Sequence, residues 1–186
     1  MRSSFDAAVL GDHVYVFGGW NLDGQADSGQ WHETAWSLDL SDSDAVWKPL
    51  AKQPFRRRVI SVAAHNGKLF VIGGVTPEGP TTDVDLYDPA LDCWTQAEPL
   101  PGVGMSEFGS SSFATGGTLY VSTLDGFVHR WSNSANDWET IAKCDPARFF
   151  HRMVPIGGSR LLVIGGANME LGKFKQIEAI LLPQAN

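Results

Sequence analysis

Short apolar runs recur along the chain, most of them followed by a pair of glycines. The runs at 14–17, 69–72 and 161–164 are apolar at every position, and two glycines follow each directly. A continuous apolar run of this length, bounded by a turn signal, is typical of a strand covered on both faces. A weaker copy at 119–121 keeps the apolar character and lacks the glycine pair. The pattern predicts a chain of buried β-strands.

The glycine pairs mark a repeat whose members are Gly18-Gly19, Gly73-Gly74 and Gly165-Gly166. The first two pairs begin 55 residues apart (18 to 73), and the third begins 92 residues later (73 to 165), close to two further periods. Residues without a Cβ permit the backbone angles and close approaches that a crowded strand end requires. A period near fifty residues is typical of a repeat architecture such as a propeller.

Tryptophans recur independently of the glycines, at Trp47, Trp94 and Trp138, with spacings of 47 and 44 residues. A shorter strand and a turn precede each of them, at 36–40, 85–89 and 129–133. Each repeat is therefore predicted to hold four short strands, and each tryptophan is expected to fill the wide outer gap between neighbouring sheets.

The order of apolar strand, glycine pair, variable loop, second strand, turn and tryptophan resembles the kelch repeat of kelch-type and galactose oxidase-like propellers. The resemblance covers almost the whole chain. It implies an all-β fold, a kelch-type β-propeller of about four blades, at residues 2–50, 55–100, 105–143 and 147–182. Each blade of such a propeller is a twisted antiparallel sheet whose faces are covered by its neighbours, which agrees with strands that are apolar throughout.

The last predicted blade is incomplete. It has strands at about 150–156, 160–165 and 174–182, without a fourth strand and tryptophan. We therefore expect residues 1–186 to form a single partial propeller, an open arc or half propeller; the alternative is a small closed ring of four blades. An open arc leaves apolar faces and strand edges in water, which predicts self-association.

Composition and charge narrow the range of partners. Fourteen Lys and Arg against 21 Asp and Glu give a net charge of −7, which disfavours a nucleic-acid partner. No apolar run approaches the roughly 18 residues that cross a bilayer, and no signal sequence follows Met1, so we expect no membrane partner and a cytoplasmic location. Cys93 and Cys144 lack the spacing of a disulfide framework or a zinc site.

One recurring position supplies candidate binding residues. It lies sixteen residues before the first glycine of each pair, with one extra residue in the fourth repeat, and holds Arg2, Arg57, Glu107 and Arg148. The resemblance places this position near the mouth of the central channel, where we expect these side chains to converge. Kelch substrate adaptors hold acidic peptides in this region, and the bidentate donors of arginine suit carboxylates. Secondary candidates are Arg56, Arg58 and Arg152. The alternative is that these are loop arginines that are solvated or paired with local carboxylates.

Two functions fit these residues. The leading interpretation is a kelch-repeat binding module that takes a protein partner or an acidic small ligand through the inter-blade loops at the channel mouth. The alternative is a sugar-directed isomerase, similar to the sialic acid mutarotase among kelch-like propellers, that uses a channel arginine with a glutamate or histidine, from Arg57, Arg148, Glu107 and His151.

No catalytic signature accompanies the repeats, so the interpretation leans away from an enzyme, and we expect no cofactor. The polar loop at 20–33 contains potential metal ligands, but no ligand spacing recurs among them: Asp23, Asp27, His32 and Glu33. We therefore expect no metal site.

Overall fold

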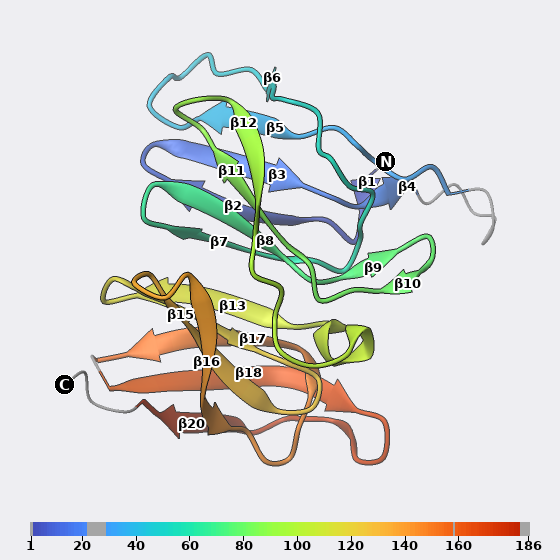
Figure 1. The fold of residues 1–186 in the computed structure, drawn as a ribbon, viewed down its shortest axis with the longest axis vertical. Coiled ribbons are helices and arrows are strands. Elements are labelled where there is room, and N and C mark those ends of the chain that lie inside the picture. Colours follow the sequence, from blue (N-terminus) through green and yellow to red (C-terminus); the bar gives the residue numbers. More distant parts are fainter. Residues whose placement is uncertain (1, 22–28, 158, 183–186) are drawn as a thin grey trace.

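The computed structural model describes residues 2–21, 29–157 and 159–182 of the chain. These residues form twenty strands, β1 to β20, and one short 3-10 helix, η1 (Gly104–Glu107). Within the same ranges no helix is long and apolar enough to span a membrane. The first two large sheets occupy one half of the molecule and the last two the other half (Figure 1).

Three complete four-stranded antiparallel sheets follow one another along the chain. The first has the order β2 (Asp6–Leu10), β3 (His13–Phe17), β5 (Trp36–Asp39), β6 (Lys48–Pro49). The second has the order β7 (Ser61–His65), β8 (Lys68–Ile72), β11 (Val84–Asp88), β12 (Cys93–Ala97). The third has the order β13 (Ser111–Thr115), β14 (Thr118–Ser122), β15 (Phe127–Ser132), β16 (Asp137–Lys143).

The fourth sheet has three long strands, β17 (Phe149–Ile156), β18 (Arg160–Asn168) and β20 (Ile177–Leu181). The short strand β19 (Gly172–Lys173) also pairs with the end of β18. Two small hairpin-like pairs lie outside the large sheets: β1 (Arg2–Ser3) with β4 (Trp20–Asn21), and β9 (Val75–Thr76) with β10 (Gly79–Pro80). The all-β fold with a four-bladed propeller arrangement is thus confirmed, including the shorter last blade among the described residues.

Apolar side chains fill the junctions between successive sheets. Tyr15 and Phe17 of β3 pack with Leu69, Val71 and Tyr87 of the second sheet. The next junctions use the same strand positions, through clusters that contain Phe70, Ile72, Leu119 and Val121, and then Tyr120, Met153 and Leu161. Burying a large apolar side chain of this kind stabilises the fold by about 1.5–3 kcal/mol. Apolar strands are needed because both faces of an internal blade are covered.

The first two glycine pairs sit where other backbone crosses the end of the second strand. Gly18 has φ +65°, and a Cβ built there would lie 2.7 Å from the carbonyl oxygen of Arg57, in the connection that leads into the next blade. Gly74 has φ +99°, and its Cβ would lie 2.6 Å from the carbonyl oxygen of Arg58, in the connection that leads into its own blade. A side chain at either position would collide with backbone, so the sequence signal reflects close approach of backbone both between and within blades.

The recurring tryptophans bind the blade that precedes their own. Trp94 Nε1 donates to the carbonyl of Ala51 at 3.1 Å, and Trp138 Nε1 donates to the carbonyl of Glu98 at 2.9 Å. Trp47, in the first blade, is 48% exposed. The tryptophans therefore fill inter-blade gaps in the second and third blades, and the first blade presents the same residue on an open face.

Candidate functional site

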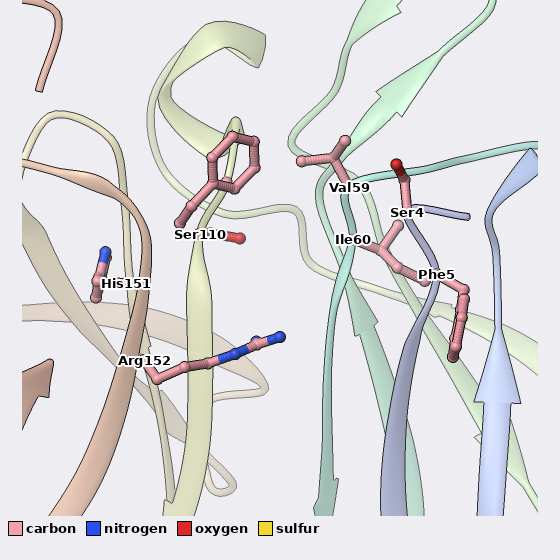
Figure 2. Close-up of a pocket in the computed structure, with 9 residues that line it drawn as sticks. Ser4, Phe5, Val59, Ile60, Ser110, His151 and Arg152 are labelled. Carbon is pink, nitrogen blue, oxygen red and sulfur yellow. The ribbon is translucent and has the colours of Figure 1, made fainter. Parts of the chain in front are cut away.

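Residues at or just before the start of the inner strands β2, β7, β13 and β17 meet around one pocket (Figure 2). The connections into the first three strands contribute two consecutive residues each, and the fourth blade contributes three consecutive residues of β17. The pocket has a volume of about 210 Å³ and is lined by Ser4, Phe5, Val59, Ile60, Gly109, Ser110, Phe150, His151 and Arg152. We call it the mouth pocket, since it opens at one end of the channel that the inner strands enclose.

Backbone conformation repeats around the mouth pocket. The first of the two residues from each blade has a positive φ: 53° at Ser4, 57° at Val59, 67° at Gly109 and 55° at Phe150. The amide of Val59 donates to Ser4 O, and the amide of Phe150 to Gly109 O, each at 2.8 Å. A positive φ is unusual for a β-branched or aromatic residue, and strained backbone of this kind gathers at functional sites.

Two buried polar atoms in the mouth pocket have no partner among the described residues. Ser110 is 6% exposed and its Oγ forms no hydrogen bond; His151 is 2% exposed and its Nδ1 forms none. The other ring nitrogen of His151, Nε2, hydrogen-bonds to Ser122 Oγ. Unpaired buried groups of this kind are normally satisfied by water or by a ligand.

The His151 ring is neutral at physiological pH. Burial, together with the charges of Arg148 and Arg152, lowers its pKa to about 4. When Ser122 donates its hydroxyl hydrogen to Nε2, Nδ1 carries the ring hydrogen and becomes a donor. Figure 2 shows the His151 ring on the other side of β17 from the Arg152 side chain, as expected of consecutive strand residues, so the polar groups that the pocket offers are the Ser110 hydroxyl and the Arg152 guanidinium.

Arg152 is the cation of the mouth pocket. Its side chain is 67% exposed and extends between the two sides of the pocket (Figure 2). One guanidinium nitrogen lies 3.6 Å from Asp6 Oδ1, so the ion pair joins the inner strands of the last and the first blade. Burial raises the pKa of Asp6. An exposed guanidinium in a pocket that also holds an unpaired hydroxyl group is suited to a carboxylate ligand.

Below the mouth pocket, the channel is lined by small residues from all four inner strands. This cavity has a volume of about 530 Å³, and Asp6 and Arg152 are its charged residues. Arg152 lines both the channel and the mouth pocket. The Asp6–Arg152 ion pair thus lies where the two spaces meet.

A repeated hydrogen bond connects the inner strands. A side-chain oxygen at the first channel position of one blade accepts from a backbone amide of the next blade: Asp6 Oδ2 from Val62 at 2.8 Å, Ser61 Oγ from Ser112 at 2.8 Å, and Ser111 Oγ from Met153 at 3.1 Å. The equivalent position in the last blade is Arg152, which has donors and no acceptor. The last blade therefore breaks the pattern.

The candidate Arg57 points into its own blade and not into the mouth pocket. It is 1% exposed, its guanidinium lies 4.0 Å from the Phe55 ring centroid, and it forms a buried ion pair with Asp85. It also donates to the carbonyls of Gly73 at 3.1 Å and Asp83 at 2.8 Å. Both terminal nitrogens of Arg57 are thus bound within its own blade, and the side chain does not line the mouth pocket.

Arg148 has the same environment in the fourth blade. It is 1% exposed, stacks at 4.0 Å from the Phe174 ring centroid and lies 2.5 Å from Glu178 Oε2. It also approaches the Gly165 carbonyl at 3.4 Å. The expected convergence of Arg57 and Arg148 at the mouth is therefore not found, because each guanidinium is neutralised and buried beside the strand that follows its glycine pair.

Glu107 occupies the recurring position in the third blade and is fully buried. Its exposure is 0%, and neither carboxyl oxygen has a hydrogen-bond partner among the described residues. Burial, and then the charge of Asp125, raises the pKa of Glu107 to about 8. The residue is mostly a neutral acid at pH 7 and does not line the mouth pocket.

Arg2, Arg56 and Arg58 do not line the mouth pocket. Arg2 donates to the carbonyl of Thr34 at 2.8 Å and to its hydroxyl at 2.5 Å. Of the residues considered for isomerase chemistry, only His151 lines the mouth pocket. Asp23 and Asp27 lie outside the described residues, and within those residues no cluster of three or more His, Cys, Asp or Glu could hold a metal ion.

The sequence predicted Arg152 only as a secondary binding candidate and did not single out Ser110 or Asp6. The repeat could have located the pocket residues, because Ser110 lies three residues after Glu107 and His151 lies three residues after Arg148. Comparing that offset in all four repeats would have placed one residue from each blade in the pocket.

Comparison with known proteins agrees with this architecture. The family model described as the Kelch motif matches residues 1–52 and 56–101. Kelch-like protein 25 of Xenopus tropicalis is 27% identical over 178 residues, which cover 89% of this chain and 29% of the relative. Kelch repeat and BTB domain-containing protein 12 of Danio rerio is 29% identical over 133 residues, covering 64% of this chain and 20% of the relative.

Among solved structures, the one titled "Structure of YjhT" superposes with a TM-score of 0.79 at 18% identity. The match covers 97% of this chain and 63% of that chain. The chain therefore spans less than a third of the length of these two sequence relatives and somewhat under two thirds of this structural neighbour. The resemblance to the kelch repeat is confirmed, and the structural likeness at this identity concerns the fold.

Proposed function

The chain belongs to the Kelch motif family, and from that premise we propose that it is a binding module whose mouth pocket takes an acidic side chain or chain terminus of a protein partner. The observation that carries this proposal is the composition of the pocket. Exposed Arg152 lines the pocket together with Ser110, whose buried Oγ has no partner among the described residues.

A carboxylate fits this set for electrostatic reasons. Its two oxygens can accept from the guanidinium and from one neutral donor at the same time, and charge-assisted hydrogen bonds are about twice as strong as neutral ones. The ligand would compete with Asp6, which already accepts from the Val62 amide at 2.8 Å. Because Asp6 keeps that bond, the exchange leaves no buried carboxylate without a donor.

The size of the pocket favours one residue over a whole small molecule. A volume of about 210 Å³ is below the range of roughly 300–1,000 Å³ usual for small-molecule sites. Exposed apolar residues surround it, with Phe5 at 45% and Phe150 at 55%. A peptide could place one carboxylate in the pocket and lay apolar neighbours on these rings, as protein interfaces commonly do.

Selection of short peptides that carry Asp, Glu or a free C-terminal carboxylate, followed by titration calorimetry, tests the proposal. We expect Arg152→Gln to weaken the selected peptide about ten- to a hundredfold, since a hydrogen bond to a charged group contributes roughly 1.5–3 kcal/mol. Replacing the key Asp or Glu of the peptide by its amide should have a similar effect.

Arg56→Gln is the matched control. Arg56 is another exposed arginine, on the connection that leads into β7; its side chain is 55% exposed and lies 3.7 Å from Glu33, and it does not line the mouth pocket. It should leave the affinity within about twofold of wild type. If both variants bind as wild type does, or if both weaken equally, the mouth pocket is not the binding site.

A further inference from the structure

A series of backbone hydrogen bonds joins neighbouring blades at the rim of the mouth pocket. The first pocket residues of the four blades form this series, and they are Ser4, Val59, Gly109 and Phe150. The amide of Val59 in the second blade donates to the carbonyl of Ser4 in the first, at 2.8 Å. The amide of Phe150 in the fourth blade donates to the carbonyl of Gly109 in the third, also at 2.8 Å. Both bonds therefore run from an amide to the carbonyl of the preceding blade.

The series is interrupted between the second and third blades. The Val59 carbonyl and the Gly109 amide hold the equivalent positions there, and neither forms a backbone hydrogen bond within the part of the chain that the structure describes. Figure 2 shows Ser4 and Val59 on one side of the mouth pocket and Ser110 and Arg152 on the other. The pocket therefore lies at this interruption.

The third blade also differs in the segment that leads to Gly109. η1 ends two residues before it, and no other described connection into an inner strand contains a helical turn. Gly109 is buried, and the next residue, Ser110, has a buried hydroxyl without a partner among the described residues. Buried backbone amides are normally satisfied by protein, water or a ligand. The interruption thus places one unpaired backbone donor and one unpaired backbone acceptor at the pocket.

One residue of an extended peptide matches this donor and acceptor. Its N–H can donate to the Val59 carbonyl and its C=O can accept from the Gly109 amide, so that the series continues from Ser4 to Phe150. Both new bonds would run in the same direction as the two bonds that the chain already forms. In peptide complexes of this kind, main-chain hydrogen bonds give affinity and side-chain pockets give specificity.

We propose that the mouth pocket binds the main chain of an extended peptide segment at Val59 and Gly109, while an acidic side chain of the segment binds Arg152. This inference rests on the proposed function and specifies its partner as a peptide segment recognised partly through its backbone. An acidic small molecule without a peptide group would reach Arg152 and leave the Gly109 amide and the Val59 carbonyl unpaired.

Amide-to-ester replacement in the selected acidic peptide tests the contact with Val59. Each backbone N–H of the peptide is replaced in turn by an ester oxygen, which removes one donor and keeps every side chain. One replacement, at the acidic residue or next to it, should weaken binding about three- to tenfold, the size of one neutral hydrogen bond. Replacements elsewhere in the peptide are the matched controls and should stay within about twofold.

Amide hydrogen exchange of the protein, followed by NMR, tests the contact with Gly109. Val59 and Phe150 are internal controls, because their amides are already bonded at 2.8 Å in the free chain. Saturation with the selected peptide should slow exchange at Gly109 by at least about tenfold more than at either control, since a new hydrogen bond protects that amide.

An ester series with no weakened member, or exchange at Gly109 that slows no more than at the controls, would overturn the main-chain contact. Arg152→Gln tests the acidic contact separately. If Arg152→Gln weakens binding while the ester series is flat, the proposed function stands and the main-chain contact is wrong. If one ester weakens binding and Arg152→Gln does not, the main-chain contact stands and the acidic contact is wrong.

Discussion

The second and fourth blades differ from the third at the same repeat position. In the former, Arg57 and Arg148 each lie over an aromatic ring, contact a glycine carbonyl and pair with a carboxylate on the next strand. In the third blade the position holds Glu107, whose carboxyl oxygens have no partner in the described structure. In the second and fourth blades the charge of the arginine is thus neutralised within the blade. In the third blade the buried Glu107 is mostly uncharged at pH 7.

The residue on the neighbouring strand that faces this repeat position also differs between the blades. Asp85 and Glu178 pair with equivalent residues of the second strand, Val71 and Val163. In the third blade the residue in that register is His129, opposite Val121, and its Nδ1 hydrogen-bonds to Thr140 Oγ1 at 3.0 Å. Both halves of the ion pair are therefore replaced in the third blade. The comparison indicates that this position contributes to the stability of a blade.

The largest loss of folding stability is expected from Arg57→Ala. Removing one partner of a buried ion pair leaves Asp85, 5% exposed, without its cation, which costs about 3–5 kcal/mol. Urea unfolding followed by tryptophan fluorescence measures the loss. The double variant Arg57→Met/Asp85→Leu should recover most of it, because apolar replacements of similar volume avoid the uncompensated charge. Unchanged stability in Arg57→Ala would remove the structural role.

An effect of opposite sign, which approaches that size only above pH 7, is expected from Glu107→Gln. The folded protein holds the Glu107 proton up to a pKa of about 8, and the unfolded chain releases it near the ordinary value of about 4.3. Unfolding therefore releases a proton between these values, and wild type loses stability as pH rises through this window.

The stability advantage of Glu107→Gln over wild type should accordingly be near zero around pH 4. It should grow by an amount on the order of 1 kcal/mol per pH unit and level off above pH 8. Urea unfolding of both proteins from pH 4 to pH 9 measures the difference. A difference that does not vary with pH would show that the carboxyl is already ionised or paired in the folded protein.

The smallest loss of folding stability is expected from Arg2→Ala. Arg2 bonds to Thr34 and pairs with no carboxylate of the described residues, and in its register the next strand carries Trp36 in place of an acid. Loss of these hydrogen bonds should cost about 1 kcal/mol, since no charge is left unpaired. The same urea series measures it. A cost as large as that of Arg57→Ala would mean that the carboxylate is not what distinguishes the blades.

Most of the fold could be predicted from the sequence because close packing restricts which residues fit at recurring positions. The glycine pairs mark contacts where a Cβ would collide with backbone, as at Gly18. The apolar runs mark strands covered on both sides, and the weak copy at 119–121 lies in β14 of a complete sheet. The tryptophans at 94 and 138 mark bonds to the preceding blade.

The site was harder to predict because spacing does not give the direction of a side chain. Residues 57 and 152 are both arginines near an inner strand, yet one is 1% exposed and the other has a side chain that is 67% exposed. The positive φ values of Val59 and Phe150 shape the mouth pocket, and such residues rarely adopt them. Only the assembled blades bring Ser110, His151 and Arg152 together.

An NMR titration of the chain with a selected acidic peptide tests the mouth pocket most directly. A carboxylate bound at the Arg152 guanidinium should shift the amide signals of Ser110 and Arg152. The amide version of the peptide should not shift them. If the acidic peptide binds while these signals stay unchanged, the partner is held elsewhere and the proposed site is wrong.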